Sequence, residues 1–139
     1  MASIDDQLRA SLECCSLGKF DEAATILAAA LTARPRHAEA LRQMGLLDLQ
    51  SGRGTEAVAR FETAAKAEPK RADLKFLLGF ALLHSGSADR GRAMLSIAGA
   101  DVRTARGCLA VADLAGQIGD PAFSESMYQA ALAIDPADA

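Results

Sequence analysis

Several residue types that build binding sites for nucleic acids, membranes or cofactors are scarce in this chain. Among its 139 residues there is no Trp, one Tyr and five Phe, so aromatic side chains make up only 4% of the sequence. The longest apolar run, Leu74 to Leu83, is interrupted by a lysine and falls well short of the ~18 residues that a membrane helix needs. The net charge is −3 and the pI is near 5.3, so no field attracts nucleic acid or an anionic membrane. We therefore expect neither a nucleic-acid partner nor membrane insertion.

Cysteine is also scarce, and its placement bears on the compartment. Cys14, Cys15 and Cys108 are an odd number without the spacing of a metal site, and we interpret them as reduced thiols of a cytoplasmic protein. The first residues are acidic and amphipathic, whereas a signal peptide has a basic start followed by an apolar run. Eleven Arg against four Lys, together with abundant Ala, favour a bacterial source.

The motifs that usually bring catalytic residues together are missing as well. His37 and His84 are the two histidines, and their positions between helical patterns favour solvated turn residues over a shared metal site. The sequence contains no nucleophile elbow, no phosphate-binding glycine loop and no dinucleotide fingerprint. We therefore predict a non-enzymatic protein that carries no metal and no cofactor.

What the chain does contain is a repeat of about 34 residues. Gly18, Gly52, Gly86 and Gly119 are separated by 34, 34 and 33 residues, and a small residue stands seven positions before each of them. Downstream of each Gly comes a triplet at i, i+4 and i+7, which is one face of an α-helix. The four triplets are Ala23-Leu27-Ala30, Ala57-Phe61-Ala64, Gly91-Leu95-Ala98 and Ser124-Tyr128-Ala131. Each unit therefore reads as two helices joined at the Gly, and Pro35, Pro69 and Pro136 close three of the units.

This pattern resembles the tetratricopeptide repeat (TPR) family, whose 34-residue units carry these small, bulky, Ala and Pro positions. The resemblance covers residues 4–138, as repeats 4–37, 38–71, 72–104 and 105–138, and we expect a single domain over residues 1–139. It implies an all-α fold, a right-handed α-solenoid of about four helix-turn-helix hairpins in which each hairpin buries its neighbour's apolar face. The third unit lacks its Pro and is one residue short, so we expect a changed packing angle and a hinge before the fourth.

In this family the first helix of each hairpin lines a concave groove that binds a protein or peptide partner. In the third unit, the residues left over from the packing face form an apolar stripe of Phe76, Phe80 and Leu83. The equivalent stripes are Leu8-Leu12-Cys15, Arg42-Leu46-Leu49 and Leu109-Asp113-Gly116. Such an apolar groove is similar to that of the small secretion chaperones of this family, which shield an apolar segment of a client. The alternative is that a helix apolar all round is buried and the stripe belongs to the core.

The last hairpin suggests a second kind of contact. A solenoid usually ends in a polar capping helix, whereas this sequence stops after the second helix of the fourth unit. Met127, Tyr128, Leu132 and Ile134 then have nothing to pack against, and a second copy of the chain would cover them as a homodimer or a scaffold. The alternative is that the fourth unit is itself the cap of the other three.

Overall fold

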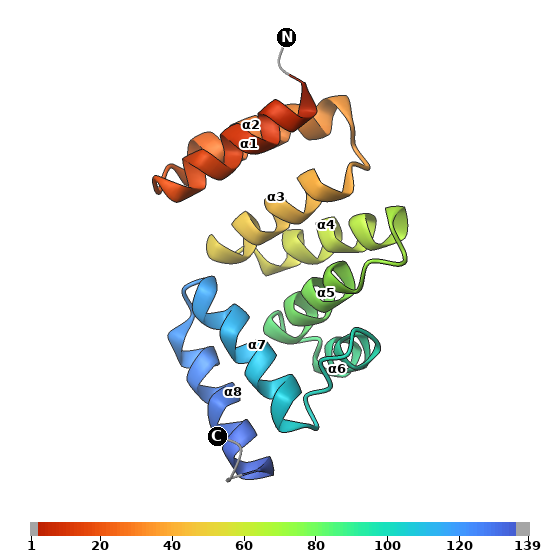
Figure 1. Cartoon of the computed structure of the whole chain (residues 1–139), viewed down its shortest axis with the longest axis vertical. Helices are drawn as coiled ribbons and strands as arrows, with labels where there is room; N and C mark the ends of the chain where they lie inside the picture. Colours follow the sequence, from red (N-terminus) through yellow and green to blue (C-terminus); the bar gives the residue numbers. More distant parts are fainter. Residues whose placement is uncertain (1–2, 136–139) are drawn as a thin grey trace. The chain divides into compact units, whose positions relative to one another are not determined.

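The computed structural model describes residues 3–135, and the regular structure in this range is helical throughout. The helices are α1 (Ile4–Ser16), α2 (Phe20–Ala33), α3 (Ala38–Gln50), α4 (Gly54–Ala67), α5 (Ala72–His84), α6 (Ala88–Ile97), α7 (Ala105–Gln117) and α8 (Pro121–Ile134) (Figure 1). They pair as the hairpins α1–α2, α3–α4, α5–α6 and α7–α8, which confirms the predicted all-α fold of four helix-turn-helix hairpins. The first helix of each hairpin begins at the first residue of its predicted repeat. Pro136 and the end of the last repeat lie outside the described residues.

The chain divides into two compact units of two hairpins each. The first unit ends at Pro69 and the second begins at Lys70. Within the first unit α2 also packs against α3, so the two hairpins are stacked through this pair. The expectation of one domain over residues 1–139 stays a prediction.

The repeated glycines form the turns inside the hairpins. Gly18, Gly52, Gly86 and Gly119 all have φ between 74° and 94°, a region that strains residues with a Cβ atom. After each Gly, the next N–H turns back to a carbonyl near the end of the preceding helix. Arg53 N, for example, donates to Asp48 O over 2.7 Å. This arrangement satisfies carbonyls that the helix end would leave without a partner.

Small residues let the two helices of a hairpin approach closely. A Cβ atom added at Gly91 in α6 would lie 2.6 Å from the backbone N of Leu83 in α5, and one added at Gly79 would lie 2.9 Å from the backbone N of Leu95. The helices therefore touch through their backbones at this point. The bulky members of the first three triplets, Leu27, Phe61 and Leu95, are fully buried, whereas Tyr128 of the fourth triplet is 42% exposed.

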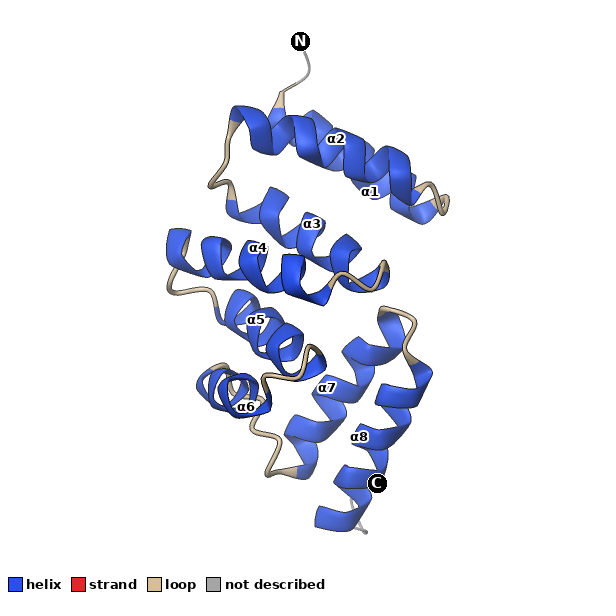
Figure 2. Cartoon of the chain, turned by 180° about the vertical axis from the view of Figure 1, so that it is seen from behind, coloured by secondary structure: helices blue, strands red, loops and turns tan. Residues whose placement is uncertain are grey.

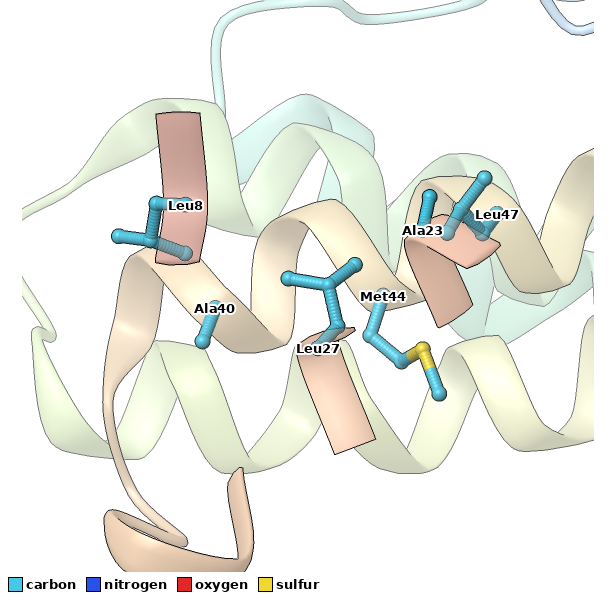
Figure 3. Packing of buried hydrophobic residues seen from close by; sticks show 6 residues of the cluster. All are labelled: Leu8, Ala23, Leu27, Ala40, Met44 and Leu47. Carbon is cyan, nitrogen blue, oxygen red and sulfur yellow. The ribbon is translucent and has the colours of Figure 1, made fainter. Parts of the chain in front are cut away.

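The core of the first unit joins its two hairpins. Leu27 and Ala23 of α2 lie in a buried cluster with Leu8 of α1 and with three residues of α3, drawn in Figure 3: Ala40, Met44 and Leu47. The α3 members recur at i, i+4 and i+7, which is one helical face. The stacking that the repeat pattern predicts is therefore seen directly between α2 and α3.

One carboxylate is buried inside the second hairpin. The Asp48 side chain is 2% exposed, and its two oxygens accept hydrogen bonds from Arg53 Nε at 3.3 Å and Arg60 Nε at 2.7 Å. A buried charge is tolerated when it is paired and hydrogen-bonded in this way. The two guanidinium groups therefore fix the turn and α4 against α3.

The junction before the fourth hairpin departs from the other repeats at the place where the sequence is one residue short, while the expected changed packing angle and hinge stay a prediction. Helix α6 has ten residues, whereas α2, α4 and α8 have 14 each. The connection that follows is folded onto the start of α7: Thr104 Oγ1 accepts from Gly107 N at 3.1 Å and donates to Asp101 O at 2.7 Å. Hydrogen bonds from Arg103 lower the pKa of the Asp101 carboxyl to about 2. The segment between α6 and α7 is therefore held by its own contacts.

Candidate interaction surface

The residues of the predicted groove stripes fall into one set of six in each unit. In the first unit Leu8 and Leu49 are buried, which corrects the expectation that they face a partner. Leu8 belongs to the core between the hairpins because it packs with the cluster around Leu27. Leu12, one turn further along α1, has 51% of its surface exposed. The structure therefore separates two leucines that the sequence pattern placed on one surface.

The α3 part of the predicted groove is half-buried and partly charged. Arg42 and Leu46 are both partly exposed and lie one turn apart on α3. The Arg42 guanidinium is held on its own helix by Glu39, with Nε 3.0 Å from the carboxylate Oε1. Of the predicted stripe residues in this unit, Leu12 is therefore exposed, and Cys15, Arg42 and Leu46 are partly exposed.

In the second unit the central residue of the predicted stripe is in the core. Phe80 has no exposed surface, whereas Phe76, Leu83 and Leu109 are partly exposed. The burial of Phe80 corrects the expectation that this ring is offered to a partner. For Phe80, the alternative interpretation of a helix buried on several sides is the one that fits.

Phe80 is covered by the start of α8 and by the last residue of its own helix. Its ring stacks on His84, with centroids 5.6 Å apart and an interplanar angle of 13°, and meets Phe123 edge to face at 5.8 Å. His84 also contacts Phe123 edge to face at 5.2 Å. Its Nε2 lies 2.7 Å from Oδ2 of Asp120. The interpretation of His84 as a solvated turn residue is therefore wrong, and we call these four residues the α5–α8 contact.

Asp120 has two functions in this contact. It is the N-cap residue of α8, where Oδ1 accepts from Phe123 N at 3.1 Å, while Oδ2 faces His84. The hydrogen bond to His84 is the main cause that lowers the pKa of the Asp120 carboxyl, and the backbone N–H of Phe123 adds to it. The ionised carboxylate therefore links the helix start to α5.

The equivalent residues at the junction of the first two hairpins make no such contact. There, Leu12 and Ser16 take the places of Phe80 and His84, and Arg53 and Glu56 take those of Asp120 and Phe123. All four are exposed, and Arg53 pairs with Asp48. The α5–α8 contact is thus a particular feature of the second unit. The sequence does distinguish the fourth repeat at the position of Phe123. The first three repeats carry a charged residue there: Glu22, Glu56 and Arg90.

Helix α8 also carries the residues predicted for self-association. Tyr128 and Leu132 are 42% and 46% exposed, whereas Met127 is partly buried against the core of its own hairpin. The Tyr128 hydroxyl donates to Asp113 Oδ1 at 2.9 Å, and this carboxylate raises the pKa of the phenol. The exposed part of the prediction is therefore Tyr128 and Leu132, together with Ile134 at the end of α8, which is 45% exposed.

The described residues hold few groups with the geometry of a chemical centre. Between residues 3 and 135, His, Cys, Asp and Glu do not gather into a group that could hold a metal ion. Burial raises the pKa values of the Cys15 and Cys108 thiols, with the Cys14 thiol and the Asp101 carboxylate as further causes. In the same range, no helix is long and apolar enough to cross a bilayer.

Two tetratricopeptide repeat profiles match the chain, one over residues 48–118 and the other over residues 16–47. Among curated protein sequences none matches at a significant level. Solved structures of similar fold include MamA MSR-1 C2, with a TM-score of 0.69, 22% identity and coverage of 99% of this chain and 80% of that one. Another is MamA 41-end from Desulfovibrio magneticus RS-1, with a TM-score of 0.68, 18% identity and coverage of 96% and 76%. At these identities the likeness concerns the fold.

Proposed function

Because the chain belongs to the tetratricopeptide repeat family, we propose that it is a non-enzymatic interaction module that binds an apolar helix or extended segment of a partner protein. The observation that carries this proposal is the exposure of Leu12, half of whose surface faces solvent on a first helix whose neighbouring Leu8 is core. The partly exposed Leu46 and Arg42 of α3 belong to the same proposed surface. Exposed apolar side chains on a rigid helical support are suited to a partner with an apolar face.

The role that fits such a surface is that of an adaptor or a chaperone. A small acidic protein that covers an apolar segment of a client would keep that segment from aggregating before assembly or export. The three free thiols fit a cytoplasmic location, and the composition rich in Arg and Ala fits a bacterial source. Secretion is the process that the resemblance to small chaperones of this family suggests.

The experiment is a selection from a displayed peptide library, followed by affinity measurements with two matched variants. Leu12→Glu places a charge on the proposed surface, whereas Leu17→Glu makes the same change at a residue that is 69% exposed in the turn after α1. We expect selected peptides to be rich in apolar residues and to lose about tenfold or more in affinity with Leu12→Glu, since a buried Leu contributes about 1.5–3 kcal/mol. Equal effects of the two variants, or no selected peptide at all, would contradict the proposal.

A second candidate function is self-assembly through α8, favoured by the exposure of Tyr128 and Leu132. These two residues lie one turn apart and present an apolar face that the described chain leaves open. We expect Tyr128→Glu with Leu132→Glu to convert a dimer into a monomer in analytical ultracentrifugation. A wild-type chain that is already monomeric at high concentration would exclude this candidate.

A further inference from the structure

The α5–α8 contact has the chemistry of a recognition site that holds a ligand. Phe80 and His84 form an aromatic wall on α5, and the His84 ring nitrogen is placed for an acidic group. Against this wall lies a helix start with two matched features, the capping Asp120 and the ring of Phe123 three residues later. The cap bond from Phe123 N to Asp120 fixes the distance between carboxylate and ring. The two features are therefore presented as one rigid group.

The first two hairpins stack without an equivalent of this fit. The first two hairpins stack through α2 and α3 while the equivalent four residues stay exposed. At the equivalent cap positions, Lys19, Arg53 and Ser87 make no side-chain cap bond, whereas Asp120 does. The fourth repeat thus differs from the others at both residues that face His84 and Phe80.

The fourth hairpin has a small core of its own between α7 and α8. Ala105, Cys108 and Ala131 are buried between α7 and α8, with Leu109 and Met127 packed beside them. Helices α6 and α7 do not pack as closely as α2 and α3 do. Figure 2 shows the α7–α8 hairpin beside α5 and α6, joined to them by the segment between α6 and α7.

We propose that Phe80 and His84 of α5 form a second recognition site, which takes a helix N-terminus carrying a capping aspartate and a phenylalanine three residues later, and that α8 of the same chain occupies this site and blocks it. A partner segment of this chemistry binds only when it displaces the fourth hairpin. The inference rests on the interaction-module function proposed above, but it concerns residues of the second unit, whereas the first proposal is tested at Leu12 in the first.

The test uses the full chain and a fluorescent synthetic peptide with the sequence of residues 119–135. In the receptor, Asp120→Ala with Phe123→Ala removes the two groups of α8 that occupy the site. We expect this variant to bind the peptide about tenfold or more tightly than the wild-type chain does, because the internal ligand no longer competes. Adding His84→Ala to the receptor, or the two alanine changes to the peptide, should abolish the binding.

Each other outcome decides against the proposal. Equal binding by the wild type and the double variant, or binding that survives His84→Ala, would show that the α5 face does not recognise this chemistry. If the double variant loses its helical circular dichroism, Phe123→Ala alone replaces it, since this change keeps the Asp120 cap. Unfolding of both variants would mean that the contact is required core packing, and the proposal would fall. Leu17→Glu, a change outside both proposed surfaces, should leave the affinity for this peptide unchanged, and the first proposed surface is tested separately by Leu12→Glu with the library-selected peptides.

Discussion

Arg60 donates a hydrogen bond of 2.7 Å from Nε to Oδ2 of Asp48 and thereby joins α4 to α3 across the second hairpin. The carboxylate is almost fully buried, while the two arginines that pair with it are partly exposed. The interaction is therefore asymmetric, because loss of the carboxylate leaves two cations that can turn to solvent, whereas loss of an arginine leaves a charge in the core.

We predict that Arg60→Ala destabilises the chain more than Arg53→Ala does. Arg60 makes the shorter bond and is the less exposed of the two arginines, so its removal leaves Asp48 with one long contact at 3.3 Å. The expected losses are about 2–3 kcal/mol for Arg60→Ala and about 1 kcal/mol for Arg53→Ala. Urea denaturation followed by far-UV circular dichroism measures both, and equal losses would show that the carboxylate does not depend on the closer partner.

Two glycines in helices provide a matched test of the close packing between helices. At Gly91, helix propensity and packing predict opposite effects of a change to Ala on stability. Gly91→Ala should destabilise the chain by about 1–3 kcal/mol, although Ala is the better helix former, because the new methyl group meets the backbone of Leu83. The matched control is Gly116→Ala in α7, where the nearest atom, Ser124 Oγ, would be 3.8 Å from the added Cβ. This change should be neutral or stabilise by about 0.5–1 kcal/mol. A stabilising Gly91→Ala would contradict the backbone contact between α5 and α6.

Phe80 and Leu12 occupy the same position of two repeats but differ in burial. Alanine substitutions at both residues compare what each side chain contributes to stability. Phe80→Ala should cost about 3–5 kcal/mol, since a fully buried ring leaves a cavity, whereas Leu12→Ala should cost about 1 kcal/mol or less. Thermal melting of the two variants gives the comparison. Similar small losses would mean that the Phe80 ring is not enclosed by His84 and Phe123.

The lowered pKa of Asp120 predicts a pH dependence with a definite sign. Because the folded-state pKa lies below the ordinary value, the carboxylate stabilises the fold above a pH of about 4 and loses this effect as the pH falls through the folded-state pKa. Asp120→Asn keeps an N-cap residue but removes the charge that faces His84. The wild type should therefore melt at a higher temperature than Asp120→Asn at pH ~6, and the gap should narrow below pH ~4.

The control for this measurement is the same substitution in a His84→Gln background. The hydrogen bond to His84 is the largest cause of the lowered pKa, so most of the pH-dependent gap should disappear there. A gap of equal size in both backgrounds would assign the effect to the cap of α8 alone.

The repeat pattern predicts the fold closely because its signals are local. A Gly such as Gly52 has a positive φ, and a small residue such as Gly79 touches the facing backbone, for reasons that a short stretch of sequence contains. The burial of Phe80 could not be predicted in this way, since it depends on where a helix some 40 residues later is docked. The burial of Asp48 could not be predicted from a short stretch of sequence either, because its partner Arg60 belongs to the next helix. The candidate surface was therefore predicted only in part, and its errors lie where long-range contacts decide.

The pairing of the helices has a consequence for how the chain acquires its structure. The closely packed pairs, from α1–α2 to α7–α8, are neighbours along the chain, so each forms after closing a short loop, as is typical of fast-folding helical proteins. The hydrogen bond between His84 and Asp120 joins residues that are 36 positions apart in the chain. It can therefore form only after α5 and the start of α8 have formed. On the ribosome, where the chain emerges from its N-terminus, the hairpins would fold one after another as they appear. Until α8 has emerged, Phe80 and His84 lack their partners Asp120 and Phe123. The proposed recognition site on α5 would therefore be open in the nascent chain.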